Sequence, residues 1–141
     1  MEQIFCGAIN QDNEKQIRHI RNSVFTYEQG VDPDIDFDGQ DAIAIHTIIF
    51  VHNAAVATGR ILKDGHIGRV AVLKPYRSFG LGTKVITALQ EYASKNNYPR
   101  IYLGSQLHAE PFYTKLGFKR FGQQYTEANI EHISMQKYLA D

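Results

Sequence analysis

The stretch RVAVLKPYRSFGLGTKV, residues 69–85, constrains the fold of this chain more than any other. It has the pattern of a strand rich in valine, then a turn with two glycines, then the start of a helix. The first turn of a helix carries unpaired N–H groups and the positive end of the helix dipole. Small residues there let the backbone approach an anion closely. Because Arg77 adds a permanent charge, the turn is suited to a pyrophosphate.

Two common phosphate-binding motifs do not explain this turn. A P-loop needs Gly-Lys-Ser/Thr after four intervening residues, and a dinucleotide fingerprint needs three glycines in the order G-x-G-x-x-G. Neither pattern is present in the stretch. The pattern that is present is R-x-x-G-x-G after a V-x-V strand. On its own, this pattern also fits a strand-to-helix turn that binds nothing.

Hydrophobic periodicity and turn residues predict the remaining elements. Strands are expected over 3–9, 42–53, 54–63, 66–74, 100–106, 119–125 and 131–139, helices over 12–28, 81–96 and 109–116, and a loop over 29–41. The order β-α-β-β-β-α-β-α-β-β predicts an α/β or α+β layer protein with a mixed sheet. We find no repeat and no linker, so we expect residues 1–141 to form a single domain.

Composition excludes several classes of partner. The chain has 141 residues, of which 43% are hydrophobic, and its 15 Lys and Arg balance 15 Asp and Glu. Zero net charge gives no reason to expect nucleic acid or an anionic membrane as partner. No apolar run approaches the roughly 20 residues that span a bilayer, and the start lacks the pattern of a signal peptide. We therefore expect a cytoplasmic protein. Cys6 is the single cysteine, and we expect it to be a buried, small apolar residue.

The acidic stretch PDIDFDG, residues 33–39, begins like a calcium-binding loop. Counted from Asp34, the twelfth position should hold a bidentate carboxylate, but it is Ile45 in an apolar strand. Calcium is therefore rejected, and the six histidines show no metal-binding spacing. Two readings stay open: a structural, solvated loop, or the lining of a pocket for a cationic amine. Arg21 lies on the apolar face of its predicted helix, so it needs a carboxylate from Glu28 or from the acidic loop.

A second motif, HAEPFYTKLGF at residues 108–118, adds to the Gly-containing turn. Together the two resemble the coenzyme A turn and the Tyr-bearing signature of the GNAT acetyltransferases. The stretches RNSVFTYEQ, DIDFDGQD, YLGSQ and EHISM extend the resemblance over nearly the whole chain, to the ElaA-like branch of that family. One departure is NIEHISM, where relatives tend to have G-I-P-H, so the acceptor side is less defined.

The resemblance implies a fold and an activity. It implies a central mixed, mostly antiparallel sheet, splayed at the acetyl-CoA site and flanked by helices. The implied reaction is direct transfer of an acetyl group from acetyl-CoA, as co-substrate, to a primary amine of a small molecule or peptide in a ternary complex. Neither a metal nor a nucleic acid or membrane partner is implied, and a homodimer is compatible with it. The alternative is a non-catalytic acyl-CoA sensor or interaction module.

The resemblance also assigns residues on the cofactor side. In this family the strand before the turn splays at a bulge, and here that strand is 69–73. Its backbone would pair with the pantetheine arm, and the Val72 N–H could polarise the thioester carbonyl. The pyrophosphate would lie against Arg77 and the turn. The full cofactor set is Val70, Ala71, Val72, Arg77, Ser78, Phe79, Gly80, Leu81, Gly82, Thr83 and Tyr113.

Among the catalytic and acceptor residues, the resemblance assigns Tyr113, and the others are candidates from their position and residue type. Tyr113 matches the family's tyrosine and is the expected general acid. Glu28 is the first candidate for the base, and His108 and His132 are the others, because a histidine titrates near neutrality. Proton removal through a chain of waters stays an alternative. The acceptor would lie against Asp36, Asp38, Asp41 and His132, which would favour polyamine-like, aminosugar or lysine-type amines.

Overall fold

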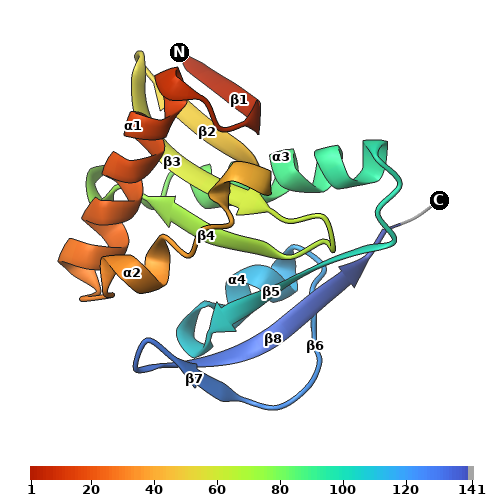
Figure 1. The fold of residues 1–141 in the computed structure, drawn as a ribbon. Coiled ribbons are helices and arrows are strands. Elements are labelled where there is room, and N and C mark those ends of the chain that lie inside the picture. Colours follow the sequence, from red (N-terminus) through yellow and green to blue (C-terminus); the bar gives the residue numbers. More distant parts are fainter. Residues whose placement is uncertain (140–141) are drawn as a thin grey trace.

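Two antiparallel sheets form the centre of the structure, a computed structural model that describes residues 1–139 (Figure 1). The first sheet has the order β1-β2-β3-β4, with β1 Glu2–Ala8, β2 Ile45–Val51, β3 Ala54–Ile61 and β4 Ile67–Val72. The second has the order β5-β8-β6, with β5 Arg100–Gln106, β8 Ile130–Tyr138 and β6 Lys119–Arg120, and β7 Tyr125–Glu127 also pairs with β8.

Helices lie between these strands and pack on the sheets. They are α1 Gln11–Arg21, the π-helix η1 Asn22–Glu28, α2 Pro33–Asp36, α3 Leu81–Lys95 and α4 Glu110–Lys115, with short 3-10 turns η2 Asp41–Ile43, η3 Lys74–Tyr76 and η4 Leu107–Ala109. Within residues 1–139, no helix is long and apolar enough to span a bilayer. The mixed α/β architecture agrees with the fold that the sequence predicts.

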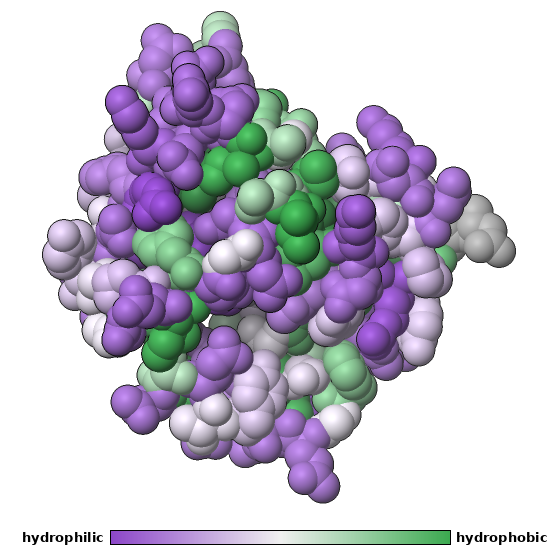
Figure 2. Space-filling model, in the orientation of Figure 1, coloured by the Kyte–Doolittle hydropathy of each residue, from purple (hydrophilic) through white to green (hydrophobic). Residues whose placement is uncertain are grey.

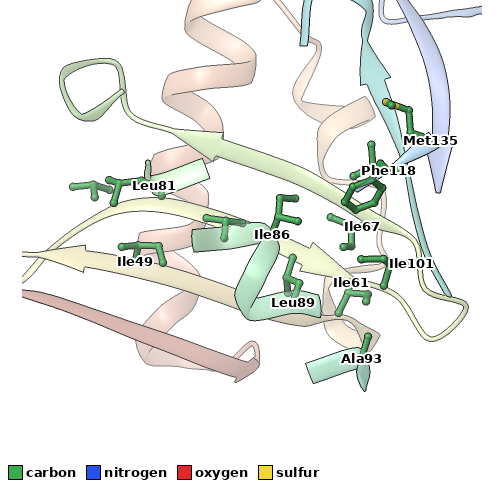
Figure 3. Close-up of a cluster of buried hydrophobic side chains, with 14 of the residues drawn as sticks. Ile49, Ile61, Ile67, Leu81, Ile86, Leu89, Ala93, Ile101, Phe118 and Met135 are labelled. Carbon is green, nitrogen blue, oxygen red and sulfur yellow. The ribbon is translucent and has the colours of Figure 1, made fainter. Parts of the chain in front are cut away.

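The main hydrophobic core lies between α3 and the sheets (Figure 3). As the periodicity predicts, Val85, Ile86, Leu89 and Ala93 of α3 are buried. They meet isoleucines of the first sheet and the residues Ile101, Phe118 and Met135 of the C-terminal half. Burial of each large apolar side chain contributes about 1.5–3 kcal/mol. This core therefore fixes α3, and with it the turn before α3, against both sheets.

The two sheets touch along one short seam and then separate. Strands β4 and β5 are joined by a parallel bridge between His66 and Tyr102, whose rings stack at a centroid distance of 4.7 Å. Beyond this bridge β4 pairs with β3, and β5 pairs with β8. The strands diverge toward their C-terminal ends (Figure 1). The sheet is therefore splayed beside the turn, as the resemblance implies.

A β-bulge interrupts β4 at the start of this splayed region. Thr58 pairs with Ala71 and Arg60 with Gly68, so residues 69 and 70 both face Gly59. Arg69 has a φ of 56°, a left-handed conformation that is rare for a residue with a large side chain. Such a bulge turns strand groups away from the ladder.

Two predicted elements differ from the structure in detail, and one prediction of burial is wrong. The predicted helix 12–28 changes at Arg21 from an α-helix to a π-helix. The predicted strand 119–125 is two short strands, β6 and β7, because Gly122 has a φ of 74° between them. Cys6 is exposed rather than buried, because β1 is the outer strand of its sheet. Apolar side chains gather on the surface near the end of β1 (Figure 2).

Candidate active site

The turn between β4 and α3 has the geometry of an anion site. Gly80 is the N-cap of α3, with a φ of 80° that favours glycine, and no side chain caps this helix. The first intrahelical bond runs from Lys84 N to Gly80 O, at 3.2 Å. The N–H groups of residues 81–83 therefore have no acceptor within the helix, and they lie at the positive end of its dipole.

Arg77 and Glu28, which the sequence analysis gives different roles, bind each other. The Arg77 guanidinium donates two hydrogen bonds to the Glu28 carboxylate, of 2.8 and 2.6 Å. Its Nε donates to the carbonyl of Val72, at 2.9 Å, which holds the side chain over the turn. The hydrogen bonds from Arg77 lower the pKa of Glu28. A carboxylate held in this way is a weak base.

A cavity of about 310 Å³ fills the gap between the splayed strands. Its walls come from η1, the acidic loop, β4, β5, α4 and the hairpin of β7 and β8, and Figure 2 shows a narrow hollow at this place. Its lining includes Arg69, Val70, Gly104, Tyr113, Tyr125 and His132. Neither Glu28 nor Arg77 is among the lining residues.

Tyr113 of α4 lines the cavity, at the position where the sequence analysis expects a general acid. Its ring packs edge-on against Phe112 and Phe118, with centroid distances of 5.0 and 5.9 Å. Burial raises the pKa of Tyr113 to about 12. The phenol therefore keeps its proton over the whole neutral range.

His132 of β8 also lines the cavity. Its Nδ1 lies 2.7 Å from the Ile130 carbonyl oxygen, which can only accept, so Nδ1 donates. In the neutral ring Nε2 is then the basic nitrogen. Tyr125 stacks on this ring at 5.5 Å, and a Cβ on Gly104 would lie 2.0 Å from the Tyr125 hydroxyl. Glycine at 104 thus leaves room for the aromatic wall.

Three carboxylates of the acidic loop, those of Asp36, Asp38 and Asp41, bind arginines. Buried Arg21 pairs with Asp36 and Asp41, at 3.1 and 2.7 Å, which confirms that it takes carboxylates from this loop. Buried Arg60 pairs with Asp38 and Asp41, at 2.8 and 2.9 Å. Of these three aspartates, Asp36 is the one that lines the cavity. The loop is thereby tied to α1 and β3.

The other predicted residues are dispersed. Val70 lines the cavity, Ala71 is buried, and Ser78 and Phe79 are exposed on the turn. His108 is exposed and is not a lining residue.

Some cavity residues were missed by the sequence analysis. Arg69 offered a signal, a charged residue inside an apolar strand, and Tyr125 offered none, because its stretch was predicted as a regular strand. Within residues 1–139, no three His, Cys, Asp or Glu side chains are grouped so that they could hold a metal ion.

Comparisons with known proteins agree with this geometry. Residues 37–139 match the model of the acetyltransferase (GNAT) domain. YyaT of Bacillus subtilis is 34% identical to this chain over 127 residues, which cover 86% of each chain. YjcF of the same organism, an N-acetyltransferase by name, is 31% identical over 137 residues, which cover 92% of this chain and 98% of YjcF. The crystal structure of Escherichia coli ElaA has a TM-score of 0.86 and 27% identity, covering 97% of this chain and 99% of ElaA. An acyl-CoA N-acyltransferase from Pseudomonas aeruginosa has a TM-score of 0.88 and 25% identity, with the same coverage. This chain therefore belongs to the GNAT acetyltransferase family.

Proposed function

We propose that this protein transfers the acetyl group of acetyl-CoA to a primary amine of a small molecule or peptide, within a ternary complex. The observation that carries the proposal is the cavity between β4 and β5, together with the uncapped N-terminus of α3, to which β4 leads through the turn. The family supports acetyl transfer, and the cavity provides space for an acceptor.

The residues at the turn fit the diphosphate of acetyl-CoA. The free N–H groups of α3 and the Arg77 guanidinium would bind its oxygens, and residues 78–83 would follow its outline. Arg77 would exchange the Glu28 carboxylate for the diphosphate. The bulge at Arg69 leaves the backbone of Val70 and Val72 to pair with the pantetheine arm. The Val72 N–H is the candidate oxyanion donor.

The chemistry needs a neutral amine and a route for its proton. The amine nitrogen attacks the thioester carbon, the C–N bond forms, and the C–S bond breaks. His132 Nε2 accepts the proton that the amine nitrogen loses. Tyr113 donates its phenolic proton to the departing sulfur, and solvent then restores both side chains. The products are an N-acetylated amine and the free thiol of coenzyme A.

Among the remaining base candidates, the contacts favour His132. Glu28 is engaged by Arg77, and His108 lies outside the cavity lining. We propose that Glu28 is the counter-ion of Arg77 until the diphosphate binds, and that the acidic loop supports the site rather than selecting cations.

Thiol release from acetyl-CoA tests this function. The purified protein is incubated with acetyl-CoA alone and with each member of a panel of primary amines. We expect release that depends on an amine, together with a product heavier than that amine by one acetyl group. If the protein binds acetyl-CoA and no amine raises thiol release above the rate of hydrolysis, the protein is a sensor and the proposal fails.

A further inference from the structure

The cationic side chain presented to the cavity is Arg69. The carboxylates that would attract a cationic acceptor are held by arginines, and the Asp36 side chain is only 1% exposed. Arg69 lines the cavity, and 19% of its side chain is exposed. This charge balance does not favour a polyamine-like acceptor.

The Arg69 guanidinium is rigidly held, and one edge of it is unused. Its Nε donates to the Asp36 carbonyl at 3.0 Å, and its Nη2 donates to the Ile35 carbonyl and to Asp38 Oδ2, at 3.1 and 3.2 Å. Its Nη1 has no hydrogen-bond partner among residues 1–139. An arginine fixed in this way loses little side-chain entropy when it binds a further anion.

Arg69 shares its counter-ions with two other arginines, because Arg21, Arg60 and Arg69 together face the carboxylates of Asp36, Asp38 and Asp41. Two of its partners are neutral carbonyls, and the carboxylates that it approaches, Asp36 and Asp38, also bind Arg21 and Arg60. Burial and the charge of Arg60 lower the pKa of Arg69, so this environment disfavours its cation. A bound anion would relieve that cost. Across the cavity the one acidic lining side chain outside the loop, Glu127, is exposed.

We infer that the acceptor is a primary amine that also carries an anionic group, a carboxylate or a phosphate, and that Arg69 binds this group. The inference rests on the proposed function. Arg69 directly precedes Val70, whose backbone is expected to pair with the pantetheine arm of acetyl-CoA. The anion would therefore lie close to the reacting amine. This spacing favours a small acceptor, such as an amino acid or an amino phosphate ester.

Matched pairs of amines test the inference in the wild-type protein. Each pair differs in the anion: glycine and alanine against their carboxamides, and O-phosphoethanolamine against ethanolamine. We expect kcat/KM to be at least tenfold higher for the anionic member than for the neutral member in at least one pair. The pair that shows this difference tells whether the anion is a carboxylate or a phosphate. Amine basicity cannot produce this result, because a nearby anion raises the pKa of the amine and leaves less of it neutral.

Two variants separate Arg69 from the network around it. Arg69→Gln should lower the ratio of anionic to neutral kcat/KM toward one. The control is Arg60→Lys. Arg60 is buried, binds the same Asp38 carboxylate and does not line the cavity. This variant should keep the wild-type ratio. An equal fall of the ratio in both variants would overturn the assignment to Arg69.

If Arg69→Gln does not fold, the matched pairs of amines still test the inference in the wild-type protein. A wild-type protein that acetylates both members of every pair equally well retains the proposed function and refutes the anion site. A wild-type protein that binds acetyl-CoA and acetylates no amine refutes the proposed function itself, and the anion site with it.

Discussion

At the scale of single residues, the ion pair between Glu28 and Arg77 is the contact that bears most directly on the proposed binding of acetyl-CoA. Both side chains are about one-third exposed, and the pair joins the end of η1 to the turn before α3. If the diphosphate of acetyl-CoA binds Arg77, the Glu28 carboxylate competes with it for the same guanidinium edge.

Glu28→Gln tests whether Glu28 is a counter-ion or a base. Because the variant removes a competing carboxylate, we expect acetyl-CoA to bind several-fold more tightly in calorimetry, on the order of 1 kcal/mol or less. We expect kcat to change by less than about threefold. A hundredfold loss of kcat at unchanged affinity would assign Glu28 as the base, since general-base catalysis contributes about 10²–10⁴ in rate.

Tyr113→Phe removes the proposed donor and keeps the packing of the ring. We expect kcat to fall at least tenfold, with the Kd of acetyl-CoA within about twofold of wild type. The raised pKa of about 12 predicts that kcat of the wild type shows no loss from phenol ionisation below about pH 10. Tyr138→Phe is the control, because Tyr138 is exposed and lies outside the cavity lining. An unchanged kcat in Tyr113→Phe would exclude it as the acid.

At the scale of elements, the acidic loop acts as a clamp on β4. Arg21 from α1, Arg60 from β3 and Arg69 from the bulge all bind the loop. A non-glycine residue in the left-handed region costs free energy, so the bulge needs such contacts to persist. The loop therefore places the splayed part of β4 against α1 and β3.

Asp38→Asn should weaken this clamp. Hydrogen bonds from Arg60 hold the pKa of Asp38 well below its usual range. Asp38 therefore stabilises the fold above its unfolded pKa of about 4, and this contribution is lost as pH falls below that value. We expect Asp38→Asn to lower the free energy of unfolding at pH 7 by about 1–3 kcal/mol. The difference from wild type should shrink between pH 4 and pH 3.

Urea unfolding at several pH values measures this effect. Asp34→Asn is the matched control, because Asp34 lies in the same loop and forms no ion pair with an arginine within residues 1–139. It should stay within about 0.5 kcal/mol of wild type. Equal losses in both variants would mean that the loop responds to net charge rather than to its arginine contacts.

The sequence predicts the regular elements well and the strained ones poorly. The apolar spacing of α3 and the valines of β4 come from local periodicity, which a single sequence carries. The π-helix has no local pattern that distinguishes it from an α-helix, whereas Gly122 is a local signal that the predicted strand 119–125 breaks there. The pairing of Arg21 was predictable because a charge on an apolar face needs a partner.

The same limit applies to the site. The turn before α3 and Tyr113 were recognisable as motifs. In contrast, Arg69 reaches the cavity because of the bulge in β4, and Tyr125 reaches it by a close approach to Gly104. These depend on how the two sheets meet.

At the scale of the whole molecule, the central claim is that two sheets splay apart so that acetyl-CoA and an amine can meet between them. Family membership rests on similarity that extends through most of the chain, and the same architecture recurs in ElaA. In the proposed reaction, every further step requires that the turn before α3 binds acetyl-CoA.

Titration of the protein with acetyl-CoA by calorimetry tests this claim most directly. We expect binding in the micromolar range, lost in Arg77→Ala and kept in Lys74→Ala, which removes a neighbouring exposed charge from the same turn. Free coenzyme A should bind at the same site, because the diphosphate supplies the main contacts. No binding of acetyl-CoA at millimolar concentration by the folded wild-type protein would contradict the account.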